Sequence, residues 1–130
     1  MAIQITAVGK TNPTNPEALM KYYPRAVQTG VVDLDLLTEQ ISISTTVTET
    51  DCHAVIISLV NTVSRALEDG KIVRLGLLGT FQISVKGTAS LMPEDVSSKN
   101  IKGASIVFRP GSRFKRMLQN LTYVKKKKRK

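Results

Sequence analysis

Cys52 and His53 are the side chains whose types first suggest chemistry, because a thiolate and an imidazole can act as nucleophile and base or as zinc ligands. Each is the only residue of its type among the 130 of the chain. Neighbours on a helix point about 100° apart, and a zinc site needs more ligands than this pair. We expect structural or surface roles for both residues.

The glycine-rich stretch Gly76-Leu77-Leu78-Gly79 matches the GXXG loop of KH domains only in its letters. It lies between two strand-like runs, and its middle pair is apolar, unlike a loop that clamps a nucleic-acid backbone. The sequence has no P-loop and no dinucleotide-binding fingerprint. We therefore expect no enzyme, no cofactor, no metal and no small-molecule substrate.

Basic side chains dominate the charge. The chain has 19 Lys and Arg against 10 Asp and Glu, a formal net charge of +9. Residues 125–130 are all basic, which leaves roughly +3 on the rest. Such a run is expected to be disordered alone, and six phosphate contacts would give a log-log salt slope of up to about −5. A solubilising tail and contact with RNA are the alternatives.

The rest of the composition indicates the compartment of the protein and the size of its core. One cysteine excludes an internal disulfide and fits a reducing compartment. No run of about 18 apolar residues and no signal-peptide layout is present, so we expect a soluble, cytoplasmic protein without a membrane partner. A chain of this length buries only a modest core, which oligomerisation would extend.

The N-terminal part has two strand-like runs. Residues 2–8 alternate between apolar and polar side chains, and residues 21–27 have strand composition. Pro24 within the second run is compatible with an edge strand. Because turn formers fill residues 10–16, we expect the two runs to pair with each other or to border the main sheet.

Two helices are predicted next. Asp33 is a candidate N-cap for the first helix, and the polar interval 42–46 ends it. Thr48 precedes a second helix whose apolar residues recur at spacings of three and four over residues 55–67, and Gly70 stops it. The apolar stripe is wide, which indicates that this helix contacts its own sheet and a partner subunit. A helix covered on both sides within a monomer is the alternative.

A hairpin follows the helices. Residues 71–75 lead into the turn 76–79, and residues 80–85 leave it with Phe81, Ile83 and Val85 on one face. Residues 104–108 are predicted to return as a strand, and Ser112 to cap a basic helix that reaches residue 121.

Two motifs in this order resemble the HU/IHF family of bacterial nucleoid DNA-binding proteins. They are Gly79-Thr80-Phe81, close to the family's GTF, and Phe108-Arg109-Pro110-Gly111, close to its F-K-P-G. The resemblance covers residues 33–121. The 27 residues from Gln82 to Phe108 are near the length that the family uses for its DNA-clasping arm. The leading 32 residues look like HU-related variants of Bacteroidetes-type bacteria.

The resemblance implies an α+β fold, an intertwined homodimer and a nucleoid-associated protein that bends duplex DNA from the minor groove with little sequence preference. It divides the chain into an N-terminal extension at 1–32, an HU-like domain at 33–121 and a basic tail at 122–130. The residues predicted to contact DNA are basic side chains of the hairpin, the arm, the last helix and the tail. They are Arg74, Lys86, Lys99, Lys102, Arg109, Arg113, Lys115, Arg116, Lys125, Lys126, Lys127, Lys128, Arg129 and Lys130. For any single one, a solvated charged surface is the alternative.

The arm departs from the family pattern. The family's Arg-Asn-Pro tip is replaced by Leu91-Met92-Pro93, and Glu94 and Asp95 follow at once. Pro93 is the candidate for an intercalating wedge, but the two carboxylates would repel phosphate. These residues favour a loop that folds back for packing. A second function therefore stays open: an HU-like structural module that lost its DNA clasp and binds protein through its N-terminal strands.

Overall fold

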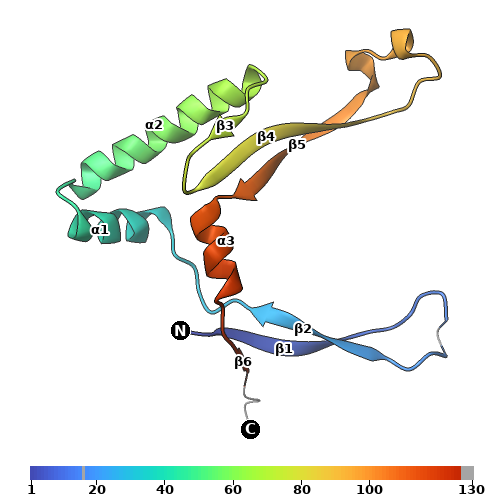
Figure 1. Ribbon diagram of the computed structural model, residues 1–130, viewed down its shortest axis with the longest axis horizontal. Helices are drawn as coiled ribbons and strands as arrows, with labels where there is room; N and C mark the ends of the chain where they lie inside the picture. Colours follow the sequence, from blue (N-terminus) through green and yellow to red (C-terminus); the bar gives the residue numbers. More distant parts are fainter. Residues whose placement is uncertain (16, 127–130) are drawn as a thin grey trace. The chain divides into compact units, whose positions relative to one another are not determined.

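The computed structural model describes residues 1–15 and 17–126, which form an α+β fold, as expected (Figure 1). The chain divides into two compact units, residues 33–116 and residues 1–32 together with the chain from Met117 onward. No helix of the described residues is long and apolar enough to cross a membrane. In chain order, the elements are β1 (Ile3–Lys10), β2 (Lys21–Val27), α1 (Leu34–Ser44), α2 (Glu49–Glu68), β3 (Val73–Arg74), β4 (Gly79–Gly87), the short 3-10 helices η1 (Pro93–Asp95) and η2 (Ser98–Asn100), β5 (Ile101–Pro110), α3 (Ser112–Gln119) and β6 (Tyr123–Lys125).

The terminal unit has a three-stranded sheet of order β2-β1-β6. The predicted pairing of the two N-terminal runs is confirmed, since β1 and β2 are antiparallel and Pro24 lies in the edge strand β2. Strand β6 was not predicted: Tyr123 pairs with Ile3 in a parallel ladder with β1. The basic tail predicted at 122–130 therefore starts as a strand at Tyr123–Lys125, and the expectation of disorder is wrong for Lys125. Residues 127–130 lie outside the described residues.

The predicted helix boundaries are set by local hydrogen bonds. The Asp33 carboxylate accepts from the backbone N–H of Leu36 at 2.9 Å, and the Thr48 hydroxyl accepts from that of Asp51 at 3.1 Å. Both side chains thus satisfy N–H groups that a helix start leaves without partners. Gly70 follows α2 with φ +80°, which favours glycine. These caps confirm the three predicted boundaries.

The second sheet has the order β3-β4-β5. The ladder between β4 and β5 runs from the Gly79–Pro110 pair to the Gly87–Ile101 pair, so the return strand is longer than predicted. The register shifts after Lys86, which leaves Lys102 as the extra residue of a bulge. As a result the two strands form a long hairpin arm (Figure 1).

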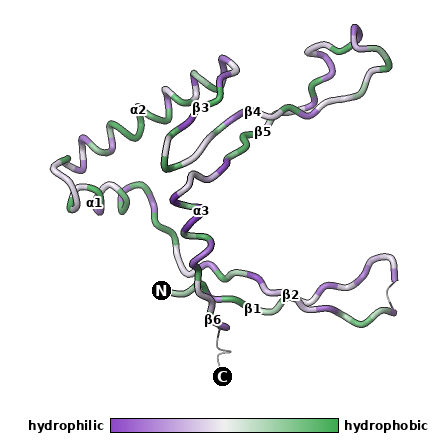
Figure 2. Tube along the Cα trace, in the orientation of Figure 1, coloured by the Kyte–Doolittle hydropathy of each residue, from purple (hydrophilic) through white to green (hydrophobic). Residues whose placement is uncertain are grey.

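Side-chain burial is sparse. Within the described residues only Thr38, Cys52, Leu67 and Gly79 are buried. The chain exposes 11731 Å², whereas a compact monomer of its mass would expose about 6,800 Å². Hydrophobic stretches recur along α2 (Figure 2). Many apolar side chains are therefore exposed to solvent in a single chain.

Two glycines allow the hairpin turn to meet the end of β5. A Cβ atom on Gly111 would collide with the backbone carbonyl oxygen of Leu77, and one on Gly79 would collide with that of Arg109. The Gly111 N–H also donates to the Leu78 carbonyl at 3.1 Å. Close backbone approach thus explains why both motifs contain glycine.

We predict that Gly111→Ala lowers the free energy of unfolding by about 1–3 kcal/mol, because the colliding atoms belong to backbone that cannot move cheaply. Gly103→Ala in the preceding strand β5 is the control, since nothing lies within 4 Å of its added Cβ. The control should change stability by less than about 0.5 kcal/mol. Urea denaturation measures both, and equal losses would show that close approach is not the cause.

Candidate nucleic-acid interface

One face of the β3-β4-β5 sheet is polar. Side chains alternate along a strand, so the face opposite Phe81 and Ile83 carries the even-numbered residues of β4. Thr80 pairs with Arg74 on one side and with Arg109 on the other. Two arginines 35 positions apart in the sequence thereby share one row. The apolar Val107, which pairs with Gln82, also lies on this face. We call this surface the polar face and define it by its polar members, Arg74, Thr80, Gln82, Ser84, Lys86, Ser105 and Arg109.

The polar face has the chemistry of a phosphate-binding surface. Arg74, Lys86 and Arg109 are exposed, and none of them pairs with a carboxylate among the described residues. A guanidinium group presents several donors that match phosphate oxygens, and hydroxyl and amide groups donate to the same backbone. The sequence analysis missed the four uncharged members of this face, although the alternation of residues 80–86 signals three of them, Thr80, Gln82 and Ser84.

Charge is strongly separated within residues 33–116. The helical part, residues 33–70, has seven carboxylates and one arginine, whereas residues 71–116 have nine basic and two acidic side chains. The net charge of residues 33–116 is therefore small although its two parts carry opposite charge. The helical part is acidic, and the part made of the sheet, the arm and the first turn of α3 is basic. A polyanion would be attracted to the second part and repelled by the first.

The arm tip is a closed turn held by Asn100. Its side-chain amide donates to the Ser90 hydroxyl at 3.0 Å and to the Thr88 carbonyl at 3.3 Å, and its oxygen accepts from the Ser97 N–H at 2.8 Å. The Thr88 N–H donates to the Asn100 carbonyl at 2.8 Å. Of the predicted contacts, Lys99 lies in η2 at this tip, whereas Lys102 is the bulged residue below it.

The prediction that the arm folds back for packing is wrong. Residues 88–99 are exposed except for Ser90, which is half-buried. Pro93 opens η1, and the apolar side chains before it face solvent, with Leu91 101% and Met92 55% exposed. Local hydrogen bonds at Asn100, and not burial, hold the tip in place.

Three more of the predicted contacts lie on α3. Arg113, Lys115 and Arg116 are exposed on α3, where Arg113 and Arg116 share a side because they are three residues apart. Ser112 is the first residue of α3 and not its cap, since the Lys115 N–H donates to the Gly111 carbonyl at 3.0 Å.

The basic run begins on the other sheet. Lys125 ends β6, and the Lys126 N–H donates to the Ile5 carbonyl at 2.8 Å. Lys127, Lys128, Arg129 and Lys130 lie outside the described residues. Lys125 and Lys126 do not belong to the polar face, so the structure divides the predicted contacts that it describes between two units.

Cys52 and His53, the residues first considered for chemistry, differ in their exposure to solvent. Cys52 is buried at 6% exposure, whereas its neighbour His53 is exposed. In the part of the chain that the structure describes, no group of three His, Cys, Asp or Glu side chains could hold a metal ion.

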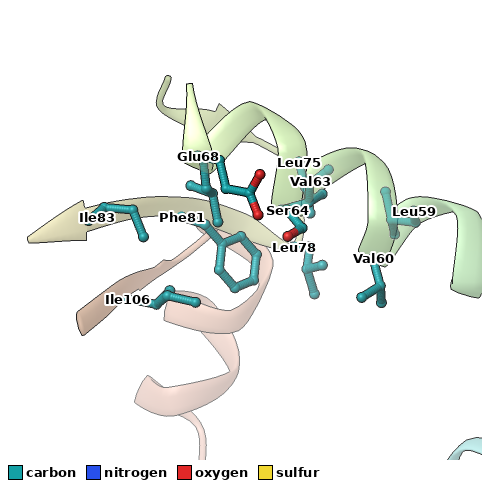
Figure 3. Close-up of a pocket in the computed structure, with 11 residues that line it drawn as sticks. Leu59, Val60, Val63, Ser64, Glu68, Leu75, Leu78, Phe81, Ile83 and Ile106 are labelled. Carbon is teal, nitrogen blue, oxygen red and sulfur yellow. The ribbon is translucent and has the colours of Figure 1, made fainter. Parts of the chain in front are cut away.

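An apolar groove lies between α2 and the other face of the sheet. It has a volume of about 640 Å³ and is open to solvent (Figure 3). Nine of its eleven lining residues are apolar, among them Val60 from α2 at 59% exposure and Ile106 from β5 at 60%. Phe81 contacts Phe108 beside it, with ring centroids 4.9 Å apart. Exposed apolar surface of this kind usually marks an interaction site.

Comparison with known proteins gives a consistent result. A family model described as an HU domain fused to wHTH, Ig or a glycine-rich motif (HU-HIG) matches residues 1–126. The fold is similar to a candidate bacterial DNA-binding protein from Bacteroides vulgatus, with 13% identity and a TM-score of 0.69 over 95% of this chain and 47% of that one. It is also similar to Anabaena HU in a complex with DNA, with 20% identity and a TM-score of 0.52 over 68% of this chain and 99% of that one. The chain thus spans about half the length of the Bacteroides protein. No curated protein matches it.

Proposed function

Because the chain belongs to the HU-HIG family, whose members contain an HU domain, we propose that it binds duplex DNA as an HU-like architectural homodimer. Binding is mainly electrostatic, directed at the phosphate backbone and nearly independent of base sequence. The protein acts in the cytoplasm as a component of the nucleoid. The polar face is the observation that carries this proposal.

Three features support DNA as the partner. The polar face aligns Arg74 and Arg109 with hydroxyl and amide donors in one sheet. The arm extends from that same sheet and ends in a closed tip with exposed Leu91 and Met92. Apolar residues at such tips are used by minor-groove architectural proteins to wedge between base steps, while basic residues hold the phosphates. The polar face, Lys99 and Lys102, and the three basic residues of α3 form the proposed contact set of residues 33–116.

The apolar groove supports the homodimer. A second copy of the chain brings the same aliphatic surface, and an isologous contact would cover Val60 and Ile106 on both copies at once. The exposed area of the single chain is roughly 1.7 times that of a compact monomer. Covering about 800 Å² per chain or more is typical of a stable interface. The acidic helical part stays away from DNA in such a dimer if the polar faces carry the contact.

We predict that Arg74→Gln/Arg109→Gln weakens binding to linear duplex DNA and lowers the magnitude of the log-log salt slope by about 1.8, since each lost phosphate contact accounts for about 0.9. The control Arg65→Gln/Lys71→Gln makes the same change in net charge outside the polar face. It should lower the slope by less than half as much. Fluorescence anisotropy between 50 and 200 mM salt measures both variants.

Equal losses in the two variants would mean that net charge, and not the polar face, sets the affinity. The carboxylates of Glu94 and Asp95 at the exposed tip favour the alternative, an interaction module that lost its clasp. If the full chain fails to bind linear, nicked and bent duplexes even near 50 mM salt, the DNA proposal is wrong and the alternative stands.

A further inference from the structure

The sheet of the terminal unit also has a basic face, which the sequence analysis did not consider. The register pairs Thr6 with Arg25, Val8 with Tyr23 and Lys10 with Lys21, and alternation puts these three pairs on one face. Ala7, Pro24 and Ala26 belong to the opposite face. We call the first surface the hairpin face and define it by Lys10, Lys21, Tyr23 and Arg25.

The cations of the hairpin face have no internal counterion. Lys10, Lys21 and Arg25 are exposed, and none of them pairs with a carboxylate within the described residues. The Lys10 ammonium lies 5.5 Å from the centroid of the Tyr23 ring, which is 46% exposed. Residues 1–32 contain three basic side chains and one carboxylate, that of Glu17 in the connection between the strands. Three like charges on adjacent strands repel one another unless an external anion lies over them.

The basic run enters this same sheet. Strand β6 is parallel to β1, and the Lys126 N–H donates to the Ile5 carbonyl at 2.8 Å. Lys125 and Lys126 are thus fixed beside the strand whose far end carries Lys10. The Ile5–Lys125 pair puts Lys125 on the face of Ala7 and Ala26, opposite the hairpin face. The basic run therefore starts from this sheet at a fixed place, but Lys125 is not part of the hairpin face.

We infer that the hairpin face is a second binding surface for the phosphate backbone of duplex DNA, separate from the polar face. Arg25 and Lys21 are four residues apart in one strand, about 13 Å, which equals the rise of about four base pairs. The Tyr23 hydroxyl can donate to the same backbone. Three exposed cations without a carboxylate partner among the described residues favour a polyanion as the partner of this face.

The test uses the full chain, linear duplex DNA and a salt series from 50 to 200 mM. Lys21→Gln/Arg25→Gln removes two charges from the hairpin face, and Arg65→Gln/Lys71→Gln makes the same net-charge change outside both proposed DNA-binding faces. The first variant should lower the magnitude of the salt slope by about 1.8, and the second by less than half of that. Circular dichroism before each titration checks that both variants retain the wild-type fold.

The outcomes separate this inference from the proposed function. Equal slopes for Lys21→Gln/Arg25→Gln and its control, or no loss in either, would overturn the hairpin face while leaving the polar face intact. A loss confined to Lys21→Gln/Arg25→Gln, with no loss in Arg74→Gln/Arg109→Gln, would support the hairpin face and contradict the polar face. A wild-type chain that does not bind duplex DNA near 50 mM salt overturns both.

Discussion

Val60→Asp is expected to convert the protein from a dimer into a monomer and to lower the free energy of unfolding by about 3–5 kcal/mol, the cost of an unpaired charge that an assembly buries. In a single chain Val60 is 59% exposed on α2, so the same substitution in a monomer should change stability by less than about 0.5 kcal/mol. The size of the effect therefore reports whether a second copy covers the groove. Light scattering at tens of micromolar and urea denaturation measure the two consequences.

Ser58→Asp is the matched control for this prediction. Ser58 is exposed on α2, about 200° around the helix from Val60, and does not line the groove. The control should remain dimeric with nearly wild-type stability. A monomeric wild-type chain, or a Val60→Asp variant that stays dimeric and stable, would contradict the homodimer.

Replacing Lys127, Lys128, Arg129 and Lys130 with glutamine is expected to lower the magnitude of the salt slope for duplex DNA by up to about 3.6, four contacts at about 0.9 each. The substitutions leave β6 and the Lys126 hydrogen bond to Ile5 intact. The affinity loss should be the same for duplexes of unrelated sequence, because phosphates carry no sequence information. Anisotropy titrations between 50 and 200 mM salt, with two unrelated duplexes, measure it.

The matched control changes the three lysines among these residues to arginine, which preserves every charge. Its slope should equal that of the wild-type chain. If the glutamine variant also keeps the wild-type slope, the tail makes no phosphate contacts and serves solubility alone.

The elements that were correctly predicted are those that neighbouring residues specify. Asp33 and Thr48 cap their helices through N–H groups three residues away, and Gly70 supplies the positive φ that ends α2. The alternation of Phe81, Ile83 and Val85 fixed which face of β4 is apolar. The HU-like fold followed from two motifs, and the family match over residues 1–126 confirms it.

The elements that were missed depend on distant partners. Strand β6 is three residues long and exists only because β1, more than a hundred positions away, offers it a ladder. The arm tip has no periodicity, and its shape comes from one asparagine that bonds to residues 10 to 12 positions back. The folded-back loop was predicted because the carboxylates of Glu94 and Asp95 would repel phosphate, but both are exposed at the end of a longer ladder.

The sequence by itself determined the helices, their ends, the alternation of the strands and the family, because hydrogen bonds and steric preferences over a few residues decide these. Only the tertiary structure decided which basic side chains share a surface. Strand register brings Arg74 to Arg109 through Thr80, pairs Lys10 with Lys21 and starts the basic run on the sheet of the terminal unit. Net charge is a sum over the chain, whereas the field that a polyanion meets depends on where the register puts each charge.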